Sequence, residues 1–400
     1  MSTDKLPDGW TRVKLGDIVR NVNENSRDLA TDGIDRVVGL DHLDPGSLHL
    51  TRWDDLADLT DGTTFTRKFK PGQVLFGKRR AYQRKVAVPD FEGVCSGDIL
   101  VFEPADQRML AEFLPYLVQS DGFFDHALGT SAGSLSPRTK WAELAKYEFA
   151  LPPLDEQQRI AELLARLSRL EGLYRSTLNA VALRREAEIG LLSGGSPEGL
   201  VPLGDAARVT SGESWSGSDE RPEPAPGAVA VVGISSLKPG GAIEYEHPTY
   251  VLGLGFKAGL VTVDEKCVIV IRTNGNPERI GNVYLATPSV EGCAISAFTF
   301  CCSFESKEQA EFAFEYMSGR AFQRWTTSLV AGSTGLKNLP VNQLRRAMVP
   351  SIKASGSAES YKRLRALREL AQSVTAACER VADLARTTRE KLLQGGVHVQ

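Results

Sequence analysis

The residues best suited to a chemical role form one basic block. Eight Lys or Arg residues and no Asp or Glu lie between Arg67 and Lys85, in a chain whose formal net charge is −3. Lys and Arg neutralise phosphates, Arg can bond guanine bidentately, and Gln can bond adenine in the same way. The alternative is a solvated basic turn, the usual fate of short charge runs. We predict nucleic-acid contacts from Lys78, Arg79, Arg80, Tyr82, Gln83, Arg84 and Lys85.

Three further loops carry similar polar residues. The apolar run Val268–Ile271 leads into a loop that contains Arg272, Asn274, Asn276 and Arg279. Two loops rich in small hydroxyl residues contain Ser134, Arg138, Ser333, Thr334 and Lys337. Hydroxyl groups, backbone amides and a cation can hold phosphates, which predicts contacts from these loops as well. Asn-Gly and Asn-Pro are also ordinary turn dipeptides, so a purely structural role for these loops remains open.

Signatures of catalysis, metal binding and cofactor binding are weak. Gly72–Lys78 matches a phosphate loop up to its lysine, but Arg79 stands where Ser or Thr is required. The five histidines are isolated, and none has the spacing of a zinc site. The six cysteines lack paired CxxC spacing, which indicates reduced, buried thiols. We therefore expect no cofactor and no metal, and no catalytic motif stands out; a duplicated nuclease or nucleotide-dependent hydrolase and a helical adaptor that joins proteins remain the alternatives.

The chain contains an internal repeat. Val13–Asp17 recurs as Val201–Asp205, and Leu191–Gly195 recurs as Leu392–Gly396. Further short matches occur in the same order, and the number of residues between the two occurrences of each match grows slowly along the chain. This pattern predicts two diverged copies of a unit of about 200 residues.

Each copy begins with a mixed α+β stretch of about 150 residues. Short β-branched and aromatic runs between turn residues predict strands at Gln73–Phe76, Ile99–Phe102, Cys267–Ile271 and Ala297–Cys302. Helical patterns lie at 109–120 and 307–318.

Each copy then ends in one long helix. Apolar residues at alternating spacings of three and four predict a coiled-coil seam, Leu364 to Leu392 in the second copy. Asp155 with Gln158 is a candidate capping pair for the first helix, and glycine pairs at 194–195 and 395–396 end the two helices. A helix of roughly 36 residues is about 54 Å long, too long for its own domain to cover. We therefore predict that the helices pack on each other, antiparallel, and hold two globular domains apart.

The predicted fold class is α+β, with two mixed α/β domains joined by two long antiparallel helices and related by a pseudo-twofold repeat. The predicted boundaries are 1–152 for the first domain, 153–196 for the central helix, 197–352 for the second domain and 353–396 for the C-terminal helix. The composition, with 42% hydrophobic and 24% charged residues, is that of an ordinary globular protein. No run of 18 apolar residues and no apolar signal core is present, so we expect a cytoplasmic protein.

Three motifs give the chain a family resemblance. They are Leu6–Trp10 with Val13–Asp17, the segment from Val74–Tyr82 through Cys95–Ile99, and Leu151–Ile160. With them the chain resembles the specificity subunit of type I restriction-modification systems over nearly its whole length. The second copy departs from the pattern, because Val349–Ile352 lacks the double proline and the Asp-Glu-Gln-Gln run.

The resemblance implies two target-recognition domains that read the two halves of a split double-stranded DNA site. It also implies a non-catalytic subunit that docks two adenine methyltransferase subunits and, in many systems, a DNA-translocating nuclease subunit. Residues that contact bases are not shared across this family, so the contacts predicted above depend on side-chain chemistry alone.

Overall fold

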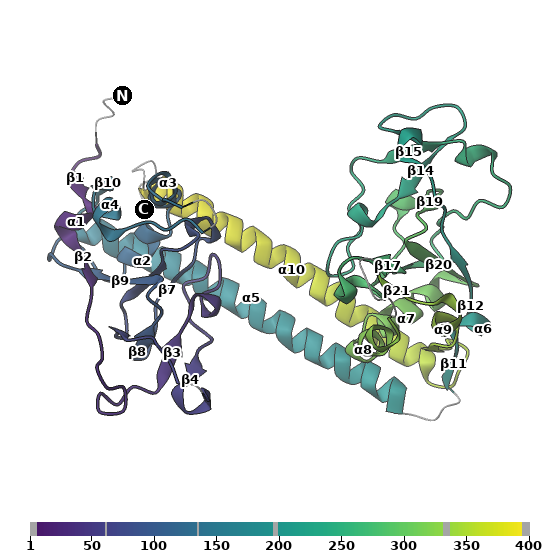
Figure 1. Ribbon diagram of the computed structural model, residues 1–400, viewed down its shortest axis with the longest axis horizontal. Helices are drawn as coiled ribbons and strands as arrows, with labels where there is room; N and C mark the ends of the chain where they lie inside the picture. Colours follow the sequence, from purple (N-terminus) through teal and green to yellow (C-terminus); the bar gives the residue numbers. More distant parts are fainter. Residues whose placement is uncertain (1–5, 61, 134–135, 195–198, 331–336, 394–400) are drawn as a thin grey trace. The chain divides into compact units, whose positions relative to one another are not determined.

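The computed structural model describes residues 6–60, 62–133, 136–194, 199–330 and 337–393 (Figure 1). The chain divides into two compact units. Unit 1 consists of Met1–Ser176 with Thr375–Gln400, and unit 2 of Thr177–Val374. The boundaries of both units fall inside long helices, so each unit combines a mixed α/β domain with segments of two helices.

Unit 1 is built on a four-stranded antiparallel sheet. Its strand order is β2 (Val19–Val22), β9 (Ile99–Pro104), β6 (Val74–Gly77) and β7 (Val86–Ala87). Successive side chains of a strand point to opposite faces. Phe76 therefore packs against α2 (Leu114–Val118) and α3 (Asp121–Gly129), whereas Leu75 packs toward a second sheet.

The second sheet of unit 1 and a strand pair complete its domain. The sheet has the order β4 (Asp54–Asp55), β3 (Arg36–Val38), β8 (Gly93–Cys95) and β5 (Arg67–Phe69). The pair joins β1 (Thr11–Lys14) to β10 (Glu148–Leu151). The short helices α1 (Leu15–Ile18) and α4 (Trp141–Leu144) follow β1 and precede β10.

Unit 2 repeats the central sheet of unit 1. Its order is β12 (Ala207–Ser211), β20 (Thr299–Phe304), β16 (Cys267–Ile271) and β18 (Val283–Leu285). In both units the first strand of the central sheet (β2 or β12) pairs with the strand of that sheet that comes last in the sequence (β9 or β20). This last strand also pairs with the strand that precedes the polar loop (β6 or β16). The pair β11 (Leu200–Pro202) with β22 (Met348–Pro350) corresponds to the pair β1 with β10.

The remaining elements of unit 2 surround this sheet. A second sheet has the order β13 (Glu220–Arg221), β15 (Thr249–Leu252), β14 (Ala228–Val232) and β19 (Ala294–Ile295). The short pair β17 (Thr273–Asn274) with β21 (Lys337–Asn338) joins two loops. The helices are α6 (Leu203–Ala206), α7 (Lys307–Met317), α8 (Arg320–Leu329) and α9 (Val341–Arg345).

Two long helices run through both units: α5 (Leu154–Gly194) and α10 (Ser357–Leu393) (Figure 1). In unit 1 the first turns of α5, with Ile160 and Leu164, share a core with Leu392 near the end of α10. In unit 2 the last turns of α5, with Ile189, share a core with Leu364 near the start of α10. Within each unit, therefore, the start of one long helix packs near the end of the other. Neither helix, in the segments that are described, is both long and apolar enough to span a membrane, and no other described helix is.

Several local predictions need correction. The predicted capping pair is wrong: α5 begins at Leu154, Asp155 lies inside the first turn, and Gln158 donates to Glu162. The helical pattern at 109–120 forms a helix only over Leu114–Val118, because turns hold the residues before it. The strand predicted at Ala297–Cys302 is β20, which begins two residues later at Thr299. Of the glycine pairs, only Gly194 lies within the described residues.

Other local predictions are confirmed. The remaining predicted strands and the helix at 307–318 occur within one or two residues of their expected bounds. All six cysteines are free thiols, and every one except Cys378 is buried.

Candidate nucleic-acid interface

Two loops lie side by side at the end of strand β6 in unit 1. The Lys78 carbonyl accepts from the Thr139 N–H at 3.1 Å, and the Pro137 carbonyl accepts from the Arg80 N–H at 2.8 Å. Arg79 and Arg138 face each other in a single antiparallel bridge. These bonds bring the basic block Lys78–Lys85 next to Arg138, although the two lie far apart in the sequence.

Asp98 is the anchor of this loop pair. Its carboxylate accepts from Arg138 Nε at 2.8 Å and from Arg79 at 3.4 Å. Arg79 Nε also donates to Ser136 Oγ at 2.7 Å. The hydrogen bond from Arg138 is the main reason why the pKa of Asp98 lies below its ordinary value. Arg79 and Arg138 are therefore partly neutralised within the protein, and a ligand phosphate would have to compete with Asp98 for them.

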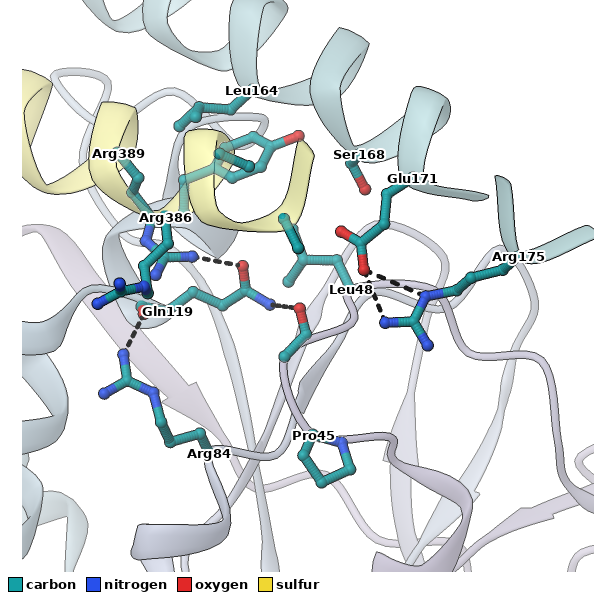
Figure 2. Close-up of a pocket in the computed structure, with 14 residues that line it drawn as sticks. Pro45, Leu48, Arg84, Gln119, Leu164, Ser168, Glu171, Arg175, Arg386 and Arg389 are labelled. Carbon is teal, nitrogen blue, oxygen red and sulfur yellow. Dashed lines mark hydrogen bonds and ion pairs between the residues drawn. The ribbon is translucent and has the colours of Figure 1, made fainter. Parts of the chain in front are cut away.

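Arg84 and Lys85 also contact the protein. The Arg84 guanidinium donates to the Gln119 carbonyl at 3.0 Å (Figure 2). It also pairs with Asp121 and lies 4.5 Å from the centre of the Phe124 ring. Lys85 Nζ donates to the Leu40 carbonyl at 2.6 Å. These contacts fasten the base of the loop to its domain, which is a structural role for both side chains.

Four residues of the block remain available to a ligand. Arg80 and Tyr82 are exposed, and Lys78 and Gln83 are half-buried. The side chains of these four form no hydrogen bond or ion pair with the described residues. Burial, followed by the charge of Arg67, lowers the pKa of Lys78. The part of the loop whose side chains are open to a ligand is therefore its tip, from Lys78 to Gln83.

Unit 2 has the same backbone arrangement with different side chains. The Phe298 carbonyl accepts from the N–H groups of Arg272 and Thr273, as the Asp98 carbonyl accepts from the Lys78 N–H. The Arg272 carbonyl accepts from the Leu339 N–H at 2.9 Å, which corresponds to the bond between Lys78 and Thr139. The two loops of unit 2 thus form the equivalent of the loop pair in unit 1.

An amide replaces the carboxylate as the anchor in unit 2. Asn338 Oδ1 accepts from Arg272 Nε and from Thr273 Oγ1, both at 3.0 Å. Arg279 donates to the Leu237 carbonyl and has a structural role. Asn274 and Asn276 each accept a backbone N–H two residues ahead, as is typical of turn residues. Lys337 pairs with Asn274 in the β17–β21 strand pair.

The sequence analysis found the loops but overlooked their anchors. Asp98, Phe298 and Asn338 were not predicted as site residues, because each lies far along the chain from the loop it contacts. The predicted contacts Ser134, Ser333 and Thr334 lie outside the described residues. The Gly72–Lys78 segment is not a phosphate loop, since Val74–Gly77 is a buried strand whose backbone pairs with β9.

Comparison with known proteins agrees with this geometry. Residues 7–182 match the sequence model of the family described as type I restriction modification DNA specificity domain. Residues 7–182, slightly less than half of the chain, are thus similar to the type I restriction-modification specificity family. Over 132 residues it is 29% identical to the type I restriction enzyme EcoDI specificity subunit of Escherichia coli. That match spans 32% of this chain and 29% of the relative.

Two solved structures share the fold across the whole chain. One is the S subunit of a type I restriction-modification system from M. genitalium, with 12% identity and a TM-score of 0.56, covering 98% of this chain and 97% of that one. The other comes from a study of complex assembly and conformational transition of the type I R-M system. It has 16% identity and a TM-score of 0.55, covering 98% of this chain and all of the other. At these identities the likeness concerns the fold alone.

Proposed function

We propose that the chain is the DNA-recognition subunit of a type I restriction-modification complex. Each α/β domain reads one half of a bipartite site in double-stranded DNA, and the subunit itself is not catalytic. The observation that carries this proposal is the loop pair, which has the same backbone bonds in both units and different polar side chains in each. Two domains that recognise different DNA sequences require the same loop backbone with different side chains on it.

The same proposal assigns the four segments of the chain. Residues 1–152 and 197–352 are the target-recognition domains, and residues 153–196 and 353–396 are the antiparallel helical pair that joins them. Continuous helices through both units support this division, because a helix is a stiff connection.

The long helices are the proposed docking surface for two methyltransferase subunits. They expose large apolar side chains that their own units leave uncovered, among them Leu170, Leu183, Leu191, Leu370 and Leu384. Exposed leucines on long helices are typical of surfaces that receive partner helices. Nuclease subunits would join the same complex through the methyltransferases.

Mapping adenine methylation tests the proposal. The chain is expressed together with its methyltransferase partner, and methylated adenines are mapped across the host genome. We expect a site with two fixed halves and a gap of constant length. Changing Arg80 and Gln83 together should alter the bases read in one half only, because both residues lie in unit 1. Methylation without a bipartite site, or no specific binding by the assembled complex, would contradict the proposal.

The helices provide a second test. Four residues are inserted near Ala180 in α5, with a matching insertion at the same level of α10. Each insertion adds about 6 Å, nearly two base pairs, and about 40° of rotation. We expect the gap to grow by one or two base pairs while both half-sites stay the same. An unchanged gap with full activity would contradict the role of the helices as a spacer.

The alternative of a nuclease or nucleotide-dependent hydrolase makes a different prediction. The purified chain alone should then cleave DNA or hydrolyse ATP in the presence of magnesium. We expect no turnover from it, because the segment that resembles a phosphate loop forms a buried strand.

A further inference from the structure

Each unit presents one large aromatic side chain at its candidate DNA edge. In unit 1 it is Tyr82, which is 56% exposed at the tip of the basic loop. In unit 2 it is Phe298, which is 46% exposed and follows strand β19. The two residues are not equivalent in the repeat, because Phe298 stands at the position that Asp98 occupies in unit 1. The shared feature is an aromatic ring beside the loop pair.

The backbone around Tyr82 is strained. Arg80 and Arg84 flank the short turn Ala81–Gln83 and have φ angles of 54° and 52°. They are the only non-glycine residues with positive φ in the described part of the chain. Such conformations cost about 1–3 kcal/mol each and persist where the surrounding structure enforces them, often at functional sites.

The contacts that enforce this turn are made by the residues around Tyr82 and not by its ring. Arg80 N–H bonds to the Pro137 carbonyl, and Arg84 is held by Asp121, Gln119 and Phe124. Ala81, inside the turn, is 1% exposed and part of the core. The turn is therefore fastened on both sides, and the only aromatic residue in it points outward.

Phe298 is held in a comparable way. Its carbonyl accepts from the N–H groups of Arg272 and Thr273 at 2.8 and 3.1 Å, and its own N–H donates to Ser296 Oγ at 3.2 Å. These bonds fix the backbone of Phe298, while its ring remains about half exposed to solvent. A phenylalanine has no polar group for which exposure to water would be favourable.

We propose that Tyr82 and Phe298 stack on bases of the DNA, each wedging one base step of its half-site. This inference rests on the proposed function and assigns a role within it. Aromatic and apolar side chains inserted at base steps unstack and kink the duplex, and stacking tolerates any base because every base has a π-face. Lys78 and Arg80 lie next to Tyr82, and Arg272 lies next to Phe298, so cations are in place to hold the flanking phosphates.

The proposal has a consequence for specificity. Pyrimidine–purine steps are easily kinked or unstacked, so a wedge selects such a step through deformability rather than through hydrogen bonds. We expect each half-site to include one flexible step at the position of the aromatic ring.

The test uses the assembled complex of the chain with its methyltransferase partner. Duplexes of the mapped site carry 2-aminopurine at one position at a time, so that unstacking appears as a rise in fluorescence. The variants are Tyr82→Ala, Tyr82→Phe and Phe298→Ala. The matched control is Phe256→Ala, which removes an aromatic ring that is 80% exposed in the short turn Leu254–Phe256 after strand β15.

For the unmodified complex we expect one fluorescent step in each half-site. Tyr82→Ala should abolish the signal in the first half and weaken binding about tenfold to a hundredfold, as alanine substitution of a stacking aromatic does. Tyr82→Phe should keep both, since the ring remains. Phe298→Ala should abolish the signal in the other half, and Phe256→Ala should change nothing.

The outcomes separate this inference from the proposed function. If the unmodified complex binds no bipartite site, the proposed function fails. If it binds one but Tyr82→Ala and Phe298→Ala behave like Phe256→Ala, recognition stands and the stacking role is refuted. Equal thermal unfolding midpoints of the variants establish that the loss comes from the ring and not from the fold.

Discussion

The loop pairs of the two units share a backbone frame but differ in what holds it. In unit 1 a carboxylate, Asp98, binds two arginines. In unit 2 a neutral amide, Asn338, binds Arg272 and Thr273. The backbone bonds that join the loops are nevertheless the same. The frame is thus independent of any one anchor, and this independence allows the exposed side chains to diverge without loss of the loop geometry.

The units also differ in how each domain is attached to its helix segments. In unit 2 the buried Glu315 of α7 pairs with Arg185 of α5 at 2.8 Å and with Arg368 of α10 at 3.1 Å. In unit 1 the amide of Gln119 accepts from Arg389 of α10 at 3.2 Å and donates to the Gly46 carbonyl (Figure 2). Burial raises the pKa of Glu315 despite the two arginines, because the carboxylate has lost its water. At this junction the domain of unit 2 thus contributes a buried carboxylate to two arginines, whereas the domain of unit 1 contributes a neutral amide to Arg389.

The largest expected effect is at the charged junction. Glu315→Ala leaves Arg185 and Arg368 without their shared partner, and we expect a loss of about 3–5 kcal/mol in the free energy of unfolding. Gln119→Ala in unit 1 should cost about 1–3 kcal/mol, because it removes the hydrogen bonds of one buried amide while Arg389 keeps its ion pair with Glu390. Urea unfolding followed by circular dichroism measures both.

The control for this comparison is an exposed ion pair of unit 2. Lys353 and Glu305 are 78% and 80% exposed, and Glu305→Ala should cost little, because water and salt screen an exposed ion pair. If Glu315→Ala costs no more than Glu305→Ala, the proposed difference between the two junctions is wrong.

The next effect concerns the anchors of the loop pairs. Asp98→Asn frees Arg79 and Arg138 from their carboxylate. We expect the non-specific DNA affinity to rise and its salt dependence to steepen by the amount that corresponds to one or two additional phosphate contacts. Asn338→Ala in unit 2 releases only one cation and should change the salt slope by about one at most. Titration of a non-specific duplex at several salt concentrations gives both slopes, and equal slopes for Asp98→Asn and the unmodified chain would refute the competition between Asp98 and phosphate.

A smaller effect is expected from Arg80, where charge and backbone strain can be separated. Both Arg80→Ala and Arg80→Gly should lower the salt slope by about one, because each removes the phosphate contact proposed for Arg80. Only the glycine variant relieves the positive φ, so it should be more stable than the alanine variant by about 1 kcal/mol. Equal unfolding free energies of the two variants would mean that the turn is not strained.

The smallest effect depends on pH. The pKa of Asp98 lies below its ordinary value of 3.8, so the unfolded chain binds this proton more readily than the folded one. Its stabilising contribution is therefore complete above that value and is lost as the pH falls below it. We expect the unfolding free energies of the unmodified chain and Asp98→Asn to differ by a constant amount from pH 7 to 5 and to converge below pH 4. A difference that does not shrink as the pH falls below 3.8 would rule out the carboxylate as its source.

The features that could be predicted from the sequence are those that local sequence patterns determine. Hydrophobic spacing gave the long helices, the short recurring motifs gave the duplicated sheet, and charge density located the basic loop. The sequence did not predict Asp98 or Asn338, because their partners are distant in the chain. The left-handed conformation of Arg80 and Arg84 was also out of reach, since arginine rarely adopts positive φ and only tertiary contacts impose it. The capping pair failed because Asp155 lies inside the helix, one residue past its first position.

Unit 1 closes with a helix segment that follows all of unit 2 in the sequence, and this affects biosynthesis. Leu392 is 1% exposed within the core formed by Ile160 and Leu164. A ribosome makes this segment, which begins at Thr375, only after all of unit 2, so the domain of unit 1 emerges first but buries its core after unit 2 has been made. Unit 2 is one uninterrupted stretch and can complete its packing earlier. A message truncated shortly before Thr375 would therefore yield a folded second domain beside a first domain with an open core, a species suited to degradation.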